Sequence, residues 1–271
     1  MAPSSTPPFA NAPLVLTAAE VRFPEVDDIS RRVEPVRELV RLLLPIRELM
    51  PTNNVQIGPD GIPSVTQTVT PRFVNRDHTT AMTVNPQAIV VETTAYDGYT
   101  EFRRLLEVCF EAAAAALSPD GVSRIGLRYI DEIRVPSVSE LPGDWSGWID
   151  ERFIASVDRS LLEETHLRPK AWQGVVQYET APDSTLVVRY GPAQGFAVLP
   201  AAPTRRLNPA EPGPYFLLDT DSFWEPSLQT PEFDAAGVLS RCDDLHTPTR
   251  KIFDAITTER LRTDVFEKER A

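Results

Sequence analysis

The feature that most constrains the fold is a change in hydrophobic period on either side of residues 118–123. Before this point, apolar residues recur at helical spacing, namely at Phe102, Leu105, Leu106, Cys109, Ala113 and Leu117. After it, in RIGLRYIDEI (residues 124–133), apolar and polar residues alternate, which predicts a strand with one buried face. A long amphipathic helix followed directly by such a strand predicts a helix that packs on a sheet.

The alternating strand has a carboxylate on its apolar face. Asp131 shares that face with Ile125, Leu127, Tyr129, Ile133 and Val135. A β-bulge at Ile130 would bring that residue inward but turn the last two outward, so we expect a regular strand. Asp131 is then expected on the core side, near a sheet edge or an opening between layers. There its carboxylate would accept backbone N–H bonds or pair with an arginine, because an unpaired buried carboxylate is costly; a ligand contact is the alternative.

The other segments predict an α+β fold with an antiparallel sheet. Strands are expected at residues 13–23, 65–76, 79–96 (with a turn at 85–87), 172–191 (a hairpin around 181–184) and 214–224. Helices are expected at residues 27–50, 100–117 (with Thr100 as N-cap), 148–164 and 231–270. Prolines at 35, 45 and 248 are expected to kink, bend or end their helices.

The order of these elements suggests two related halves, each a mostly antiparallel sheet covered by long helices. The halves are expected at residues 13–140 and 145–271, with a loop at 53–64 and a long connection at 199–214. The chain has 26 prolines and 12 glycines, and residues 1–12 form a proline-rich tail that we expect to be disordered.

Composition excludes some functions. The net charge of −12 does not favour nucleic-acid binding, which usually requires a basic surface. No apolar run approaches the roughly 20 residues that span a bilayer, and the N-terminus lacks a secretory pattern, so we expect a cytoplasmic protein without a membrane contact. The chain lacks a phosphate-binding glycine loop and other cofactor motifs, so no cofactor is expected.

Two groups of residues have the spacing of metal ligands. Asp219 and Asp221 lie on the same face of a strand and could contribute oxygen ligands to a divalent cation; a solvated strand end is the alternative. Cys242 and His246 are four residues apart on a helix, a spacing found in zinc sites. Two more zinc ligands are needed, and His78 and His166 fall in distant loops. Cys109 and Cys242 are otherwise expected to be buried thiols, and His246 a packed histidine.

The polar face of RIGLRYIDEI carries three arginines in line. Arg124, Arg128 and Arg134 could bind an acidic partner or a phosphate, with Tyr129 and Asp131 as binding candidates on the other face. The alternative is an outer face of cross-strand ion pairs, each of which contributes little to stability.

RIGLRYIDEI resembles the hallmark strand of a sporadically distributed bacterial family of uncharacterised function, in which the strand reads like IGLRYINRI. Other segments resemble the same family: residues 12–23, 99–117, 216–225 and 243–257, so that the resemblance covers residues 9 to about 266. Family members usually have asparagine at the position of Asp131 and a basic residue at that of Glu132. The resemblance implies a shared fold, but no reaction and no catalytic residues.

Three functions are compatible with these patterns. The sequence favours a non-enzymatic protein-interaction or regulatory module, of an antitoxin-like, immunity-like or defence-associated kind, with a protein partner. The second is a metal-dependent hydrolase or nuclease that uses Asp219, Asp221 and His246. The third is a small-ligand sensor with a pocket between sheet and helices, at whose mouth Asp131 and Tyr129 lie.

Overall fold

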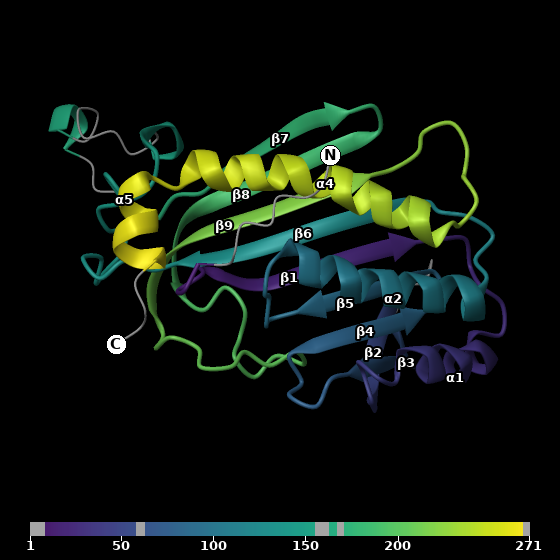
Figure 1. Ribbon diagram of the computed structural model, residues 1–271. Coiled ribbons are helices and arrows are strands. Elements are labelled where there is room, and N and C mark those ends of the chain that lie inside the picture. The colour runs from purple at the N-terminus through teal and green to yellow at the C-terminus, as the bar shows by residue number, and fades with distance from the viewer. Residues whose placement is uncertain (1–8, 58–62, 155–162, 167–170, 268–271) are drawn as a thin grey trace.

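The computed structural model describes residues 9–57, 63–154, 163–166 and 171–267. These residues form one antiparallel sheet with helices packed on one face (Figure 1). The nine described strands follow the order β2-β3-β4-β5-β1-β6-β9-β8-β7. The α+β class expected from the sequence is therefore confirmed.

The first part of the chain contributes six strands and two helices. They are β1 (Leu14–Arg22), α1 (Ile29–Val40), β2 (Ile46–Ile57), β3 (Pro63–Val74), β4 (Thr80–Asn85), β5 (Ala88–Thr93), α2 (Tyr99–Leu117) and β6 (Arg124–Ile133). The second part contributes the 3-10 turn η1 (Glu151–Phe153), β7 (Gly174–Ala181), β8 (Ser184–Gly195), β9 (Gly213–Trp224), α4 (Ala235–Ile256), α5 (Glu259–Leu261) and the π-helical turn η3 (Arg262–Phe266).

The two halves of the chain share this sheet rather than forming one each. In the middle of the sheet β1 pairs with β6, β5 pairs with β1, and β9 pairs with β6. The helices also mix, because Leu239 and Leu245 of α4 join the core that α2 covers. The boundary near residue 140 therefore falls within one folded body.

The helix expected at residues 27–50 is too long. In the structure α1 ends at Val40, and residues 46–50 begin the edge strand β2. Pro45 explains the change, because a proline disfavours helical geometry in the residue before it and cannot donate a backbone hydrogen bond. Pro35, in contrast, lies inside α1.

Other helix predictions also need correction. The N-cap of α2 is Gly98 rather than Thr100, and its φ of 95° is one that glycine adopts without steric cost. Helix α4 contains Pro248 without a break and ends at Ile256. Of the helix expected at 148–164, the described part shows η1 and, at its end, helical residues 163–165, and residues 155–162 lie outside the described residues.

The expected tail of residues 1–12 is partly packed. The ring of Phe9 lies 5.3 Å from that of Phe266, and the backbone N–H of Asn11 donates to the carbonyl of Phe266 at 2.8 Å. Burial of an aromatic ring offsets the entropy of ordering this segment. Residues 1–8 of the predicted tail lie outside the described residues.

Two apolar cores hold the layers together. The larger core lies between α1, α2, the first part of α4 and the strands β1, β4, β5 and β6. The smaller core surrounds Phe216 and contains Trp145, Trp148 and Ile256. Helix α4 contributes to both cores, and this places its middle over β6 and β9. No helix among the described residues is both long and apolar enough to cross a membrane.

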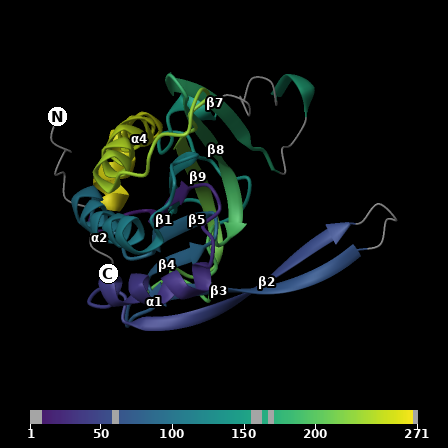
Figure 2. The ribbon, with the colours of Figure 1, turned by 90° about the vertical axis from the view of Figure 1, so that its right-hand side faces the viewer.

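Seen from the side, the hairpin of β2 and β3 extends beyond the rest of the fold (Figure 2). The opposite face of the sheet from the helices is crossed by residues 196–212, which connect β8 to β9 and which we name the strap. These residues contain most of the proline-rich connection expected at 199–214, whose last two residues instead begin β9.

Candidate functional site

A cavity of about 110 Å³ lies between the sheet and α4, on the helix face. Its walls come from the N-terminal segment, the turn before α2, β6, β9 and α4. Six of its lining residues have aromatic rings: Phe9, Tyr96, Tyr99, Tyr129, His246 and Phe253. We name this cavity the tyrosine pocket.

Local sequence periodicity explains how these side chains meet. Tyr129 and Asp131 are two residues apart on β6, so both point to the helix face. His246, Arg250 and Phe253 follow helical spacing on α4 and therefore share one side of that helix.

An irregularity in β1 shapes the pocket floor. The register of β1 against β6 shifts between Leu14, which lies opposite Asp131, and Leu16, which lies opposite Ile130. The extra residue is therefore Val15 on β1, and β6 stays in unbroken register with β9. This agrees with the regular strand expected for residues 124–133. Leu14 lines the tyrosine pocket, while Val15 lines a cavity with Glu132 and Arg134. The shift in register therefore lies where these two neighbouring residues point to opposite faces of the sheet.

Asp131 lines the tyrosine pocket and is only 4% exposed. Among the described residues its carboxyl group has neither a hydrogen-bond donor nor an ion-pair partner. Burial, and secondarily the charge of Asp219, raise the pKa of Asp131 to about 8. The prediction that the Asp131 carboxylate pairs with an arginine or a backbone N–H was therefore wrong for the described residues. The arginines of β6 point to the other face. Asp131 also lies in the interior of the sheet rather than at its edge, at the opening between layers.

A second polar group in the tyrosine pocket lacks a partner. The Oγ1 atom of Thr220 is buried and makes no hydrogen bond to any described residue. Thr220 lies opposite Tyr129 in the β6–β9 register and also lines the pocket. A buried hydroxyl is normally hydrogen-bonded, so a polar group of a bound molecule would supply the partner that Oγ1 of Thr220 lacks.

The tyrosines and the histidine hold one another in place. The Tyr129 hydroxyl and Nδ1 of His246 share a hydrogen bond at 3.0 Å, and the rings of Tyr99 and His246 stack at 3.8 Å. The Tyr99 hydroxyl donates to Asp243 at 2.9 Å. Burial lowers the pKa of His246 to about 4, so this imidazole is neutral at pH 7.

The zinc spacing of Cys242 and His246 does not assemble a site. Cys242 is buried, and burial raises the pKa of its thiol to about 12, so it is not a thiolate at pH 7. In the part of the chain that the structure describes, no three side chains of histidine, cysteine, aspartate or glutamate come together as metal ligands. Cys109 is likewise a buried thiol, as expected.

The three arginines of the row, Arg124 and Arg128 in β6 and Arg134 directly after it, face away from the helices and pair within the chain. Arg128 donates to both carboxylate oxygens of Asp219 at 2.8 Å. Arg124 lies 2.7 Å from Glu20 and 3.6 Å from Asp221. These pairs match the ion-pair alternative for the arginine row. They also occupy Asp219 and Asp221, which share a face as predicted but lie among cations that would repel a metal ion.

The third arginine, Arg134, belongs to a buried cluster around Glu132. The Glu132 side chain is 1% exposed and accepts from Arg134 at 2.9 Å, from Arg206 at 2.9 Å and from the backbone N–H of Ala197 at 2.9 Å. Because Ala197 and Arg206 belong to the strap, Glu132 fastens the strap to the sheet.

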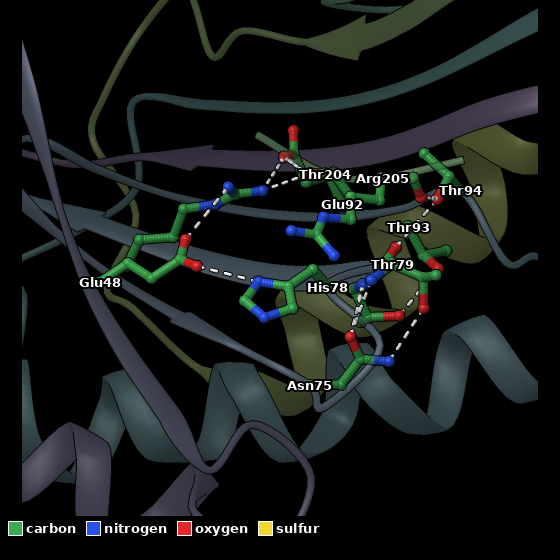
Figure 3. Close-up of polar contacts among 11 residues, drawn as sticks. Glu48, Asn75, His78, Thr79, Glu92, Thr93, Thr94, Thr204 and Arg205 are labelled. Atoms are coloured by element: carbon green, nitrogen blue, oxygen red, sulfur yellow. Dashed lines mark hydrogen bonds and ion pairs between the residues drawn. The ribbon is translucent and has the colours of Figure 1, made fainter. Parts of the chain in front are cut away.

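A further polar network, in which Thr204 of the strap bonds to Glu92, holds the strap near β3 (Figure 3). Arg72 of β3, whose side chain is 1% exposed, belongs to this network. Arg72 donates to Glu92 at 2.7 Å and to the Thr204 hydroxyl, and a carboxylate oxygen of Glu48 lies 2.9 Å from Nδ1 of His78. Nothing in the local pattern of β3 marks Arg72 as buried. Its partners are 20 and 132 residues away in the chain, so sequence reasoning missed this network.

Sequence reasoning named Tyr129, Asp131 and His246 but missed Tyr96, Thr220 and the other residues of the tyrosine pocket. Periodicity placed each of these residues on its helix or strand, whereas the contact between elements depends on the strand order.

No family model matches the chain, and no curated protein matches it significantly.

Proposed function

We propose that this protein is a non-enzymatic regulatory protein that binds a small molecule in the tyrosine pocket. The observation that carries the proposal is the Asp131 carboxyl group, which is 4% exposed, lines a cavity and has no partner among the described residues. A buried carboxyl without a partner destabilises a fold, so a ligand that supplies one gains binding energy there.

The other pocket residues favour binding over catalysis. Burial raises the pKa of Tyr96 and Tyr129 above the normal value for tyrosine, so their hydroxyls keep their protons. The neutral His246 is fixed by its hydrogen bond to Tyr129 and its stacking on Tyr99. Such rigid walls give orientation to a ligand and supply no activated nucleophile.

A pocket-filling variant tests this proposal. Thr249 is buried in α4 and lines the pocket, so Thr249→Phe should place a ring in the cavity. In a thermal-shift screen of small organic cations, anions and neutral compounds, we expect at least one compound to raise the melting temperature of the wild type by several degrees and to leave Thr249→Phe unchanged.

Thr247→Phe is the matched control, because Thr247 is exposed on the same helix and does not line the pocket. It should respond to ligands like the wild type. If every compound that stabilises the wild type also stabilises Thr249→Phe, or if none stabilises the wild type, the proposed site is wrong.

We also propose a protein partner through which the regulatory state is read, of the antitoxin-like, immunity-like or defence-associated kind. The arginine row is a weak candidate surface, because its charges are paired internally. The β2–β3 hairpin is favoured instead, since it extends beyond the body and exposes Leu49 and Val69 (Figure 2).

Mutation of the hairpin tests the partner proposal. Leu49→Asp combined with Val69→Asp should remove a protein that co-purifies stoichiometrically with the tagged wild type from its host. Leu42→Asp, at an exposed leucine in the turn after α1, should retain it. A partner lost only on reversing the charges of Arg124 and Arg128 would place the interface on the arginine row instead.

Two structural proposals accompany the function. We propose that the halves are versions of one unit, since in each a first strand pairs with the last strand of a meander and a long helix follows (β1, β5, α2 and β6, β9, α4). We also propose membership of the bacterial family that RIGLRYIDEI resembles.

A further inference from the structure

We propose that the tyrosine pocket selects a small organic ammonium ion, whose N–H groups donate to Asp131 and to Oγ1 of Thr220 and whose charge lies against the tyrosine rings. This inference rests on the proposed function and names the chemical class of its ligand.

The carboxyl group defines the sign of the ligand's charge. Arg128, three residues before Asp131 and therefore on the opposite face of β6, is bound to Asp219 through both carboxylate oxygens at 2.8 Å. No described cation therefore neutralises Asp131, and the complementary charge is left for the ligand. The unpartnered Oγ1 of Thr220 adds a hydrogen-bond acceptor on the next strand, which suits an ammonium with several N–H donors.

The aromatic walls suit the same ligand. The rings of Tyr96 and Tyr129 stand at 89° to each other with their centroids 6.0 Å apart, and the Tyr99 ring lies flat on His246. Rings at right angles present faces and edges to one enclosed volume, and a cation against a ring face is attracted by the ring quadrupole. Because His246 is neutral, it does not repel a cation at pH 7.

Arg250 is the one lining residue that would attract an anion instead. Its Nε donates to both carboxylate oxygens of Asp254, at 3.1 and 3.0 Å. This pair lies on the partly exposed side of α4, and Asp254, which does not line the pocket, gives the guanidinium a carboxylate partner. Among the described residues that line the pocket, Asp131 is therefore the one charged or ionisable group without a hydrogen-bond or ion-pair partner, and it is an acid.

Binding should be linked to proton release from Asp131. Its pKa of about 8 means that the empty pocket holds the protonated acid at pH 7. An ammonium ion favours the carboxylate, so the carboxyl O–H breaks, its proton goes to solvent, and the carboxylate accepts the ligand's N–H bonds. The titratable and charged groups that face Asp131 from the surrounding elements, or through the sheet, are Tyr96, Tyr99, Tyr129, Asp219, His246 and Arg250. Of these, Asp219 raises the pKa of Asp131 from the opposite face of the sheet.

The test compares three compounds that share a 2-phenylethyl group by isothermal titration calorimetry on the full chain. They are 2-phenylethylammonium, neutral 2-phenylethanol and anionic 3-phenylpropanoate. We expect the ammonium compound to bind at least about 10-fold more tightly than the other two, since each unpaired buried polar partner strongly disfavours a ligand that cannot satisfy it. In buffers of different ionisation enthalpy, its binding at pH 7 should release close to one proton, and its affinity should rise between pH 6 and pH 8.

Variants then assign the effect to the carboxyl group. Asp131→Asn should weaken binding of the ammonium compound by about 30-fold or more and abolish the proton release. Tyr96→Leu should weaken binding by about 3-fold or more through loss of a ring face. Asp244→Asn makes the same chemical change on the exposed side of α4 and should leave the affinity within about 2-fold of the wild type.

The outcomes separate the ligand class from the proposed function. If the neutral or anionic compound binds best and Thr249→Phe prevents it, the pocket binds ligands but the ammonium inference is overturned. If none of the three binds at millimolar concentration, the ammonium inference is also overturned, and the thermal-shift screen decides the proposed function separately.

Discussion

Asp131→Asn is expected to gain stability relative to the wild type by on the order of 5 kcal/mol as the pH rises from 4 to 9. The pKa of Asp131 is about 8 in the folded protein and 3.8 in a model compound, and one pKa unit corresponds to about 1.4 kcal/mol. Asparagine does not titrate, so the difference between the two proteins isolates the contribution of this carboxyl group.

The direction follows from where the proton is held. Below about pH 3.8 the carboxyl group is protonated in both the folded and the unfolded chain, so its ionisation does not affect stability. Between that pH and about 8, the unfolded chain has lost the proton and the folded chain retains it. Rising pH therefore favours unfolding in this window, and above it the cost stays constant.

Urea unfolding at a series of pH values measures this effect. The buried amide of the variant changes the free energy of unfolding by an amount that does not depend on pH. The test is therefore the slope of the free energy of unfolding against pH. Asp244→Asn, at an exposed position, should change the free energy of unfolding by less than about 0.5 kcal/mol throughout. Parallel curves for the wild type and Asp131→Asn would show that the carboxyl group has a partner in solution.

Glu132→Ala is expected to lower the free energy of unfolding by about 3–5 kcal/mol, because it removes a buried carboxylate and leaves two partly buried arginines without their shared partner. Glu132 receives hydrogen bonds from Arg134, Arg206 and the backbone of Ala197, and its side chain is 1% exposed. Since two of these donors belong to the strap, the variant should also free residues 196–212 for cleavage.

Equilibrium unfolding and limited proteolysis check both parts of this expectation. Glu38→Ala removes a glutamate from an exposed pair with Arg41 and should cost less than about 1 kcal/mol. Cleavage of Glu132→Ala should begin within the strap, whereas the wild type and Glu38→Ala should resist it. A loss below about 1 kcal/mol for Glu132→Ala would mean that the strap is held mainly by the Arg72 network.

The fold class could be predicted because period-2 and period-3.6 patterns are local. The alternation at residues 124–133 placed Tyr129, Asp131 and the arginine row on the correct faces, and most strand positions followed from similar runs. The predicted helix at residues 27–50 was too long because apolar residues at 43, 44 and 46 continue a helical spacing across Pro45. The helical spacing of the apolar residues and the conformational preference of Pro45 conflict there, and β2 forms by pairing with β3.

The candidate site could be predicted only in part. Asp131 was recognised as unusual from its place in the alternation, but its lack of a partner depends on which elements face it. Arg128 was a reasonable partner by distance along the chain, yet it lies on the opposite face and binds Asp219. Tyr96 and Thr220 lie in ordinary-looking segments 35 and 89 residues from Asp131, and only the strand order brings them to one cavity.

Asp131 and Glu132 are joined by one peptide bond and point to opposite sides of the sheet. One lines the tyrosine pocket and the other fastens the strap, so the two regions are separated by the thickness of a single strand. A ligand that changes the orientation of this peptide acts on both regions at once. Thermodynamic reciprocity then requires attachment of the strap to change the ligand affinity by the same factor. Coupling between ligand binding and strap attachment then needs no path through helices or subunits, because Asp131 and Glu132 share one peptide bond of β6.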